Sequence, residues 1–313
     1  MSESVAMRRG LKGAPEEHRL PEQRPTLEEA QLWCKQLASS HYENFHVATW
    51  FLPKRVRPHF ESIYAYCRVS DDLGDEVADP QTALRLLDTW GAMLDECYDS
   101  PENSQHPVFV ALQPTIEACN LPRQLFSDLL IAFRMDQVKT HYGTWEELLE
   151  YSHYSANPVG RLVLWVCGFR EERLALLSDK VCTALQLANF WQDVVEDAER
   201  GRRYLPAEAM EDFGVEEGQI LGRVFTREFR GMMQSLVQRT RTMLLQGGSI
   251  STFVDKDLAV TLDLFRKGGE AILDGIAAQD YDVLRGRPMV TKVKKLQLLA
   301  GALLGKLRMG SER

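Results

Sequence analysis

The fold class of this chain is decided by the stretch Tyr64-Ala65-Tyr66-Cys67-Arg68-Val69-Ser70-Asp71-Asp72-Leu73-Gly74-Asp75-Glu76. At about 100° per residue in an α-helix, one aromatic residue, one arginine and two aspartates fall within a sector of roughly 60°. This polar face consists of Tyr64, Arg68, Asp71 and Asp75, and the apolar faces include Ile63, Ala65, Cys67, Val69 and Leu73. The stretch therefore predicts a helix that has a carboxylate face and a core face.

A second polar stripe occurs later in the chain and consists of Gln186, Asn189, Asp193 and Asp197. On one continuous helix these residues lie within roughly 80° of one another. The residues around them are almost all apolar, and a helix that is apolar on nearly every side is buried. Buried carboxylates are costly without partners, so this stripe predicts a cavity that contains cations.

The rest of the chain has the same helical periodicity, with no alternating β pattern, internal repeat or GxGxxG motif. We predict an all-α fold with one domain over residues 26–313, and a flexible tail over residues 1–25 because this part is charged and contains three prolines. Thr26 and Glu29 match a capping box. Helices are predicted over 58–75, 82–98, 107–119, 122–140, 144–154, 157–169, 171–197, 223–245, 255–276 and 291–308, besides one that starts at residue 26.

Composition and charge limit the classes of partner. The formal net charge is −8, and no long basic face appears, which argues against nucleic acid as a partner. The six cysteines include no CxxC pair, which predicts reduced thiols in a cytoplasmic protein. The longest apolar stretch, residues 163–169, is too short to span a bilayer. Residues 293–307 are apolar and basic; packing on the core is favoured, and peripheral contact with the inner membrane face is the alternative.

Both polar stripes space their aspartates as DxxxD. Neighbouring like charges on a helix repel each other, whereas a divalent cation makes the arrangement favourable. Mg²⁺ binds one or two carboxylates, keeps waters and completes its shell with phosphate oxygens; Mn²⁺ is an alternative ion. One such pair is usually solvated surface, but two pairs favour metal ions that hold a diphosphate leaving group. Arg68 and the group Arg202, Arg203 and Tyr204 are candidate diphosphate ligands.

The first stretch resembles the first aspartate motif of the squalene/phytoene synthase family. Gln186 to Asp197, followed by Arg202 and Tyr204, resembles the second, and the likeness extends from about His41 to Leu299. The resemblance implies a single-domain isoprenoid synthase fold (a trans head-to-head prenyl transferase fold) with a central cavity. It also implies Mg²⁺-dependent condensation of two prenyl diphosphates through a cyclopropyl diphosphate.

The resemblance further implies roles for individual residues. The positions that match metal ligands are Asp71, Asp75, Asn189, Asp193 and Asp197. The positions that match the diphosphate or metal shell are Arg68, Gln186, Asn189, Arg202 and Tyr204. The positions that match the cavity wall are His41, Phe45, Tyr64, Asp136 and Gln137. Independently of the resemblance, four aromatic residues could line an apolar cavity and stabilise a carbocation through their π faces: Phe45, Tyr64, Phe190 and Trp191.

Three segments, HYENF (41–45), SANPVGRLVL (155–164) and FWQDVVED (190–197), resemble the hydroxysqualene synthase branch of bacterial hopanoid pathways. That branch converts presqualene diphosphate and water to hydroxysqualene, so no nicotinamide cofactor is expected. Asn157 stands where relatives usually have glycine, and our hypothesis is that it orients the attacking water. The alternative is that Asn157-Pro158 only breaks a helix.

Two other functions stay open at this stage. One is a presqualene diphosphate, squalene or phytoene-type synthase that starts from two prenyl diphosphates. The other is a helical scaffold or partner-binding protein whose acidic stripes are solvated; it predicts no Mg²⁺ requirement and no diphosphate release.

Overall fold

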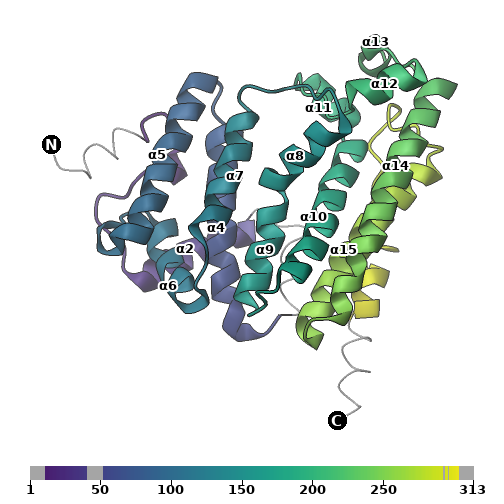
Figure 1. Ribbon diagram of the computed structural model, residues 1–313. Helices are drawn as coiled ribbons and strands as arrows, with labels where there is room; N and C mark the ends of the chain where they lie inside the picture. The colour runs from purple at the N-terminus through teal and green to yellow at the C-terminus, as the bar shows by residue number, and fades with distance from the viewer. Residues whose placement is uncertain (1–10, 41–51, 292, 295, 303–313) are drawn as a thin grey trace. The chain divides into compact units, whose positions relative to one another are not determined.

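The computed structural model describes residues 11–40, 52–291, 293–294 and 296–302 (Figure 1). Among these residues helices dominate and no β-strand occurs, although an isolated bridge pairs His141 with Arg203. The predicted all-α class is therefore confirmed. Contacts group the chain into two compact units, Met1–Val138 with Arg161–Arg170 and Lys139–Gly160 with Glu171–Arg313.

The first unit contains the helix that carries the first aspartate stretch. Its helices are η1 (Glu16–His18), α2 (Leu27–Ser40), η2 (Lys54–Val56), α4 (Arg57–Asp75), α5 (Pro80–Asp99), η3 (Pro101–Asn103), α6 (Pro107–Cys119) and α7 (Arg123–Met135). Tyr66 and Trp90 are fully buried in its core. The Tyr66 hydroxyl donates to the Phe126 carbonyl at 3.1 Å, and Trp90 Nε1 donates to Ser70 Oγ at 2.9 Å. These bonds tie α4 to α7 and α5, because large buried side chains with a polar atom need a partner for it.

The prediction of a flexible tail through residue 25 is wrong for residues 11–25. Leu11, Ala14 and His18 are each at most 2% exposed, so this segment forms part of the core of the first unit. The three buried side chains follow the spacing i, i+3, i+7, but the charged residues and prolines around them concealed so short a pattern. The predicted capping box is confirmed: Thr26 N–H donates to Glu29 Oε2 at 2.8 Å, and Glu29 N–H donates to Thr26 Oγ1 at 3.3 Å.

The second unit is built around α10. Its helices are α8 (Trp145–Ser155), α10 (Glu172–Gln192), α11 (Val194–Glu199), α12 (Ala207–Phe213), α13 (Glu217–Leu221), α14 (Arg227–Gly247), η4 (Gly248–Thr252) and α15 (Lys256–Ala278), and α9 (Asn157–Val166) starts in this unit. α10, α14 and α15 pack side by side (Figure 1). Trp191 Nε1 on α10 donates to Thr240 Oγ1 on α14 at 2.8 Å, and both residues are fully buried.

The predicted helix over residues 171–197 is interrupted. α10 ends at Gln192, Asp193 adopts φ −104° and ψ 17°, and α11 begins at Val194. α12 and α13 were not predicted, because five to seven residues are too few to show a helical period. The predicted helix over 122–140 ends at Met135.

No described helix is long and apolar enough to cross a membrane. Near the C-terminal end, residues 296–302 are helical, and Leu298, Gly301 and Ala302 line a cavity of about 260 Å³ together with residues of α15. Val293 and Leu296 are 65% and 68% exposed.

Candidate functional site

The carboxylate face of α4 is arranged as its spacing predicts. Tyr64, Arg68 and Asp71 are half-buried and Asp75 is exposed, whereas Val69 and Leu73 are fully buried on the other side. Burial raises the pKa of the Tyr64 hydroxyl, an effect that Arg68 partly offsets. The helix therefore presents one aromatic ring, one guanidinium group and two carboxylates together.

Arg68 forms ion pairs with three carboxylates on or next to this face. Its Nη1 lies 3.4 Å from Asp71 Oδ2, and its Nη2 lies 3.4 Å from Glu76 Oε1. It also forms a close two-pronged ion pair with Asp72, with 3.1 Å between Nε and Oδ2. Asp72 is only 3% exposed and was not a predicted site residue. It points into the core of the first unit, where His18 Nε2 lies 2.7 Å from its Oδ2.

The second aspartate stretch has a bend at its centre. Asn189 is exposed, Gln186 is half-buried, and Asp193 lies at the junction of α10 and α11. The Asp197 N–H donates to the Asp193 carbonyl at 2.8 Å, so one helical turn still separates the two carboxylates. The four residues are thus brought together in the second unit, although not on one straight helix.

Arg287 is a candidate site residue that the sequence did not indicate. Its guanidinium forms a close ion pair with Asp193, with 3.1 Å between Nη2 and Oδ2. It also lies 3.4 Å from a carboxylate oxygen of Glu196. These carboxylates raise the pKa of Arg287. The sequence feature that could have drawn attention to Arg287 is the triplet Arg285-Gly286-Arg287 after α15, but it lies in a segment without helical periodicity.

Asp197 has the most unusual electrostatic environment on α11. Burial first, and then the nearby Asp193 carboxylate, raise the pKa of Asp197 from 3.8 to about 7, although Arg200 and Arg202 oppose the shift. A carboxylate that is disfavoured by burial and by a second carboxylate is one that a cation would stabilise.

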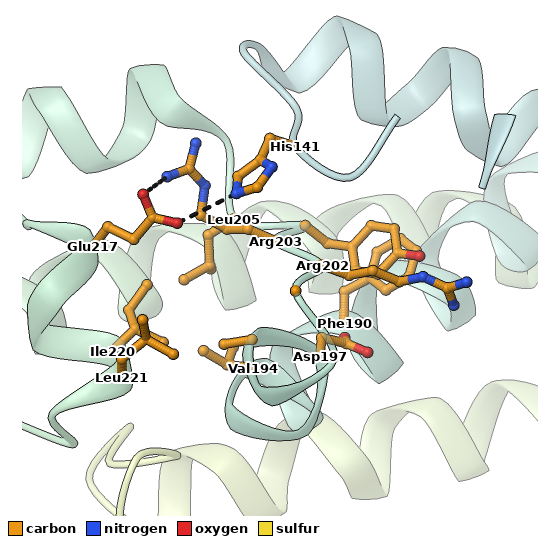
Figure 2. A pocket seen from close by; sticks show the side chains of 13 residues that line it. His141, Phe190, Val194, Asp197, Arg202, Arg203, Leu205, Glu217, Ile220 and Leu221 are labelled. Carbon is orange, nitrogen blue, oxygen red and sulfur yellow. Dashed lines mark hydrogen bonds and ion pairs between the residues drawn. The ribbon is translucent and has the colours of Figure 1, made fainter. Parts of the chain in front are cut away.

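Asp197 lies in the wall of a cavity of about 200 Å³ (Figure 2). Phe190 and Tyr204 also line it, and their rings stack 3.7 Å apart at an angle of 5°. On the other side, Glu217 of α13 lies between Arg203 Nη1 at 3.1 Å and His141 Nε2 at 3.3 Å. The cavity thus combines two carboxylates (Asp197 and Glu217), two adjacent arginines (Arg202 and Arg203) and an aromatic wall.

Asn157 is 7% exposed and is the first residue of α9, directly after α8 and Ala156. Its amide oxygen accepts a hydrogen bond from Thr183 Oγ1 at 2.9 Å. The Asn157-Pro158 pair therefore does separate two helices, and the role in orienting water stays a hypothesis.

The remaining predicted cavity residues fall into two groups. Asp136 is the half-buried residue that follows α7, and Gln137 Nε2 next to it donates to the Gly74 carbonyl on α4 at 3.2 Å. Gln137 thereby holds the C-terminal end of α4. His41 and Phe45 lie outside the described residues.

The donors in both stretches suit Mg²⁺, because they are carboxylate and amide oxygens. No three His, Cys, Asp or Glu side chains converge on one point in the described part of the chain. Mg²⁺ does not require such a cluster, since it commonly takes one or two carboxylates and fills its shell with water and substrate phosphate. The observation that fits a cation there is the half-buried Asp197 carboxylate, which lies one helical turn from Asp193.

Known proteins give an independent comparison. The squalene/phytoene synthase family model matches residues 38–294. The 15-cis-phytoene synthase of Synechococcus elongatus is 31% identical over 301 residues, which cover 89% of this chain and 94% of that protein. The chloroplast phytoene synthase 3 of Zea mays is 30% identical, and the match spans 88% of this chain but 65% of that protein's length.

Solved structures agree with this comparison. Squalene synthase HpnC from Alicyclobacillus acidocaldarius has a TM-score of 0.78 and 41% identity, and covers 87% of this chain and 98% of its own. A dehydrosqualene synthase solved with a ligand also has a TM-score of 0.78, with 25% identity and coverage of 91% and 98%. The isoprenoid synthase fold is therefore confirmed, and this chain belongs to the squalene/phytoene synthase family.

Proposed function

We propose that this protein ionises presqualene diphosphate in a Mg²⁺-dependent reaction, and that water captures the resulting cation to give hydroxysqualene and diphosphate. The observation that carries the ionisation step is the second aspartate stretch, where Asp193 and the half-buried Asp197 lie one turn apart beside a cavity with two arginines. Such a group of charges suits a magnesium diphosphate.

In this proposal each aspartate stretch supplies oxygen ligands of Mg²⁺. Those of the first unit are Asp71 and Asp75 on α4, and those of the second unit are Asn189 on α10, Asp193 at the junction and Asp197 on α11. When bound, Mg²⁺ neutralises the charge that develops on the leaving diphosphate. Arg68 and Arg202 bind phosphate oxygens through their guanidinium groups. The stacked rings of Phe190 and Tyr204 contribute an apolar, electron-rich surface that suits a carbocation.

The choice of substrate and product rests on similarity. The chain is 41% identical to the Alicyclobacillus squalene synthase but about ten percentage points less so to the phytoene synthases. That difference supports a substrate and product of the squalene type over those of the phytoene type. The phytoene synthase matches keep a second candidate open, which is a synthase that joins two prenyl diphosphates.

The test supplies purified protein with farnesyl diphosphate or presqualene diphosphate separately, with Mg²⁺ and without NADPH. We expect an alcohol, identified by mass spectrometry, from presqualene diphosphate only, and no diphosphate release when EDTA is present. Presqualene diphosphate or phytoene formed from simple prenyl diphosphates would establish the second candidate. A chain that releases no diphosphate from any substrate would be a scaffold.

Asn157 is proposed to orient the attacking water while Thr183 holds its amide. Asn157→Gly should lower the share of alcohol relative to hydrocarbon products and should leave diphosphate release largely intact. Thr183→Val is a matched variant, since it replaces only the hydroxyl that fixes the amide with a methyl group. An unchanged alcohol share in Asn157→Gly would leave Asn157 as a helix junction only.

Contact with a membrane surface is proposed for the segment from residue 293 onward, where the described residues Val293 and Leu296 are at least 65% exposed beside Lys294. An apolar and basic surface of this kind favours anionic lipid. Binding to anionic but not to neutral liposomes, lost in Val293→Ser/Leu296→Ser, is the expected result.

A further inference from the structure

The segment before α2 is held in one place on the first unit. Its buried residues are Leu11, Ala14 and His18. Arg85 on α5 donates to the Lys12 carbonyl at 2.6 Å, and Arg24 donates to the Ser104 carbonyl at 2.8 Å. These bonds anchor the segment on both sides of His18. The position of the imidazole is therefore fixed by the anchored backbone as well as by its hydrogen bond with Asp72.

His18 has one polar contact that connects it to α4. Its Nε2 lies 2.7 Å from Asp72 Oδ2, and the two residues are 1% and 3% exposed. A carboxylate only accepts hydrogen bonds, so Nε2 carries the proton and donates it. Nδ1 is buried and has no hydrogen-bond partner among the described residues, so the contact with Asp72 is the side-chain hydrogen bond that orients the ring.

Asp72 in turn holds Arg68. The Arg68 guanidinium faces three carboxylates, and Asp72 is the buried one, whereas Asp71 and Glu76 are about half exposed. A buried and doubly held carboxylate fixes the guanidinium more firmly than exposed carboxylates can. The chain of contacts therefore runs from His18 through Asp72 to Arg68, and from Arg68 to Asp71 of the metal-binding stretch.

We propose that His18 is a positioning residue for the first aspartate stretch. It orients Asp72, Asp72 fixes the direction of Arg68, and Arg68 then presents itself and Asp71 to the magnesium diphosphate. The inference rests on the proposed function, and it deepens it by assigning a role to the segment before α2. The family model begins to match at residue 38, so this support comes from a part of the chain that lies outside the matched region.

The experiment compares His18→Ala and His18→Gln with the unaltered full chain. Two quantities are measured: the Mg²⁺ concentration that gives half-maximal diphosphate release, and the affinity for Mg²⁺ with inorganic diphosphate by calorimetry. Loss of a residue that orients a metal site typically costs about 10–100-fold. His18→Ala should therefore raise the half-maximal Mg²⁺ concentration, and lower the affinity, by about tenfold or more. His18→Gln keeps an N–H donor near the Nε2 position and should recover most of the loss.

His59→Ala is the matched control. His59 is also a histidine that ties α4 to another segment through one side-chain hydrogen bond, in this case 2.9 Å from Nδ1 to Thr115 Oγ1 on α6. Among the described residues, its side chain forms no hydrogen bond or ion pair with Asp72 or Arg68. This variant should lower the melting temperature without changing the Mg²⁺ dependence, which separates positioning from plain stability.

The results distinguish a failure of the His18 role from a failure of the proposed function. Unaltered Mg²⁺ dependence in His18→Ala, or an equal change in His59→Ala, overturns the role of His18 even when the enzyme is active. If the unaltered chain releases no diphosphate, the proposed function fails. Calorimetry then decides the inference by itself. Weaker binding by His18→Ala than by the unaltered chain upholds it. Equal binding by the two chains, or no binding by the unaltered chain, overturns it.

Discussion

The ionised Asp197 carboxylate should destabilise the folded protein, and Asp197→Asn should therefore increase the free energy of unfolding. Burial and the neighbouring Asp193 raise the pKa of Asp197 from 3.8 to about 7. A group whose pKa is higher in the folded state favours unfolding as the pH rises, because the unfolded chain ionises first. The stability loss therefore begins near pH 4, grows through the range between the two pKa values, and is complete above about pH 7.

The magnitude follows from the pKa values. A rise from 3.8 to about 7 corresponds to roughly 4 kcal/mol of disfavoured ionisation. The Asp197 side chain is in part accessible to water, so screening reduces the net effect to about 1–2 kcal/mol. Asp197→Asn removes the charge and nearly preserves the shape. It should therefore raise the free energy of unfolding by about 1–2 kcal/mol at pH 8 and by much less at pH 5.

The assay is denaturant unfolding of both chains at pH 5 and pH 8, in the presence of EDTA. Glu199→Gln is a matched control on the same short helix, because Glu199 is exposed and pairs with Arg223 at 2.7 Å; it should give no pH-dependent gain. The same Asp197→Asn protein should have lost diphosphate release. Equal stability of Asp197→Asn and the unaltered chain at pH 8 would refute the electrostatic reasoning.

Other predictions concern the same unit. Arg287→Ala removes a cation beside Asp193, so Mg²⁺ should bind the substrate-free protein more tightly by about 1 kcal/mol, roughly fivefold, as calorimetry can measure; weaker binding would contradict this. Gly160→Ala places a methyl group against Ser178 Oγ and Cys182 Sγ and should destabilise the protein by about 1–3 kcal/mol in thermal unfolding. A neutral effect of Gly160→Ala would mean that α9 can move away from α10.

The sequence was sufficient to predict long helices in which the helical pattern of polar and apolar residues is strong. α4, α6 and α15 lie within two residues of their predicted ends because polar and apolar faces repeat over many turns. The same periodicity placed Tyr64, Arg68, Asp71 and Asp75 on one face. It also extended the helix through Asp193, since a single residue that leaves helical geometry does not disturb the apolar pattern on either side.

Contacts between distant segments were beyond the sequence. His18 precedes Asp72 by 54 positions and Arg287 follows Asp193 by 94, and neither has a spacing relation to its partner. Both partners are polar side chains in segments without long helices. Periodicity therefore finds the carboxylates and misses the groups that hold them.

The two aspartate stretches share an arrangement that bears on how a magnesium diphosphate would bind. Asp71 pairs with Arg68, and Asp193 pairs with Arg287. A cation that approaches either aspartate must compete with a guanidinium group, which weakens binding of the ion alone. A diphosphate changes this balance, because its oxygens can accept the guanidinium groups and also complete the shell of Mg²⁺. Metal and diphosphate should therefore bind cooperatively, and by linkage each should strengthen the other by the same factor.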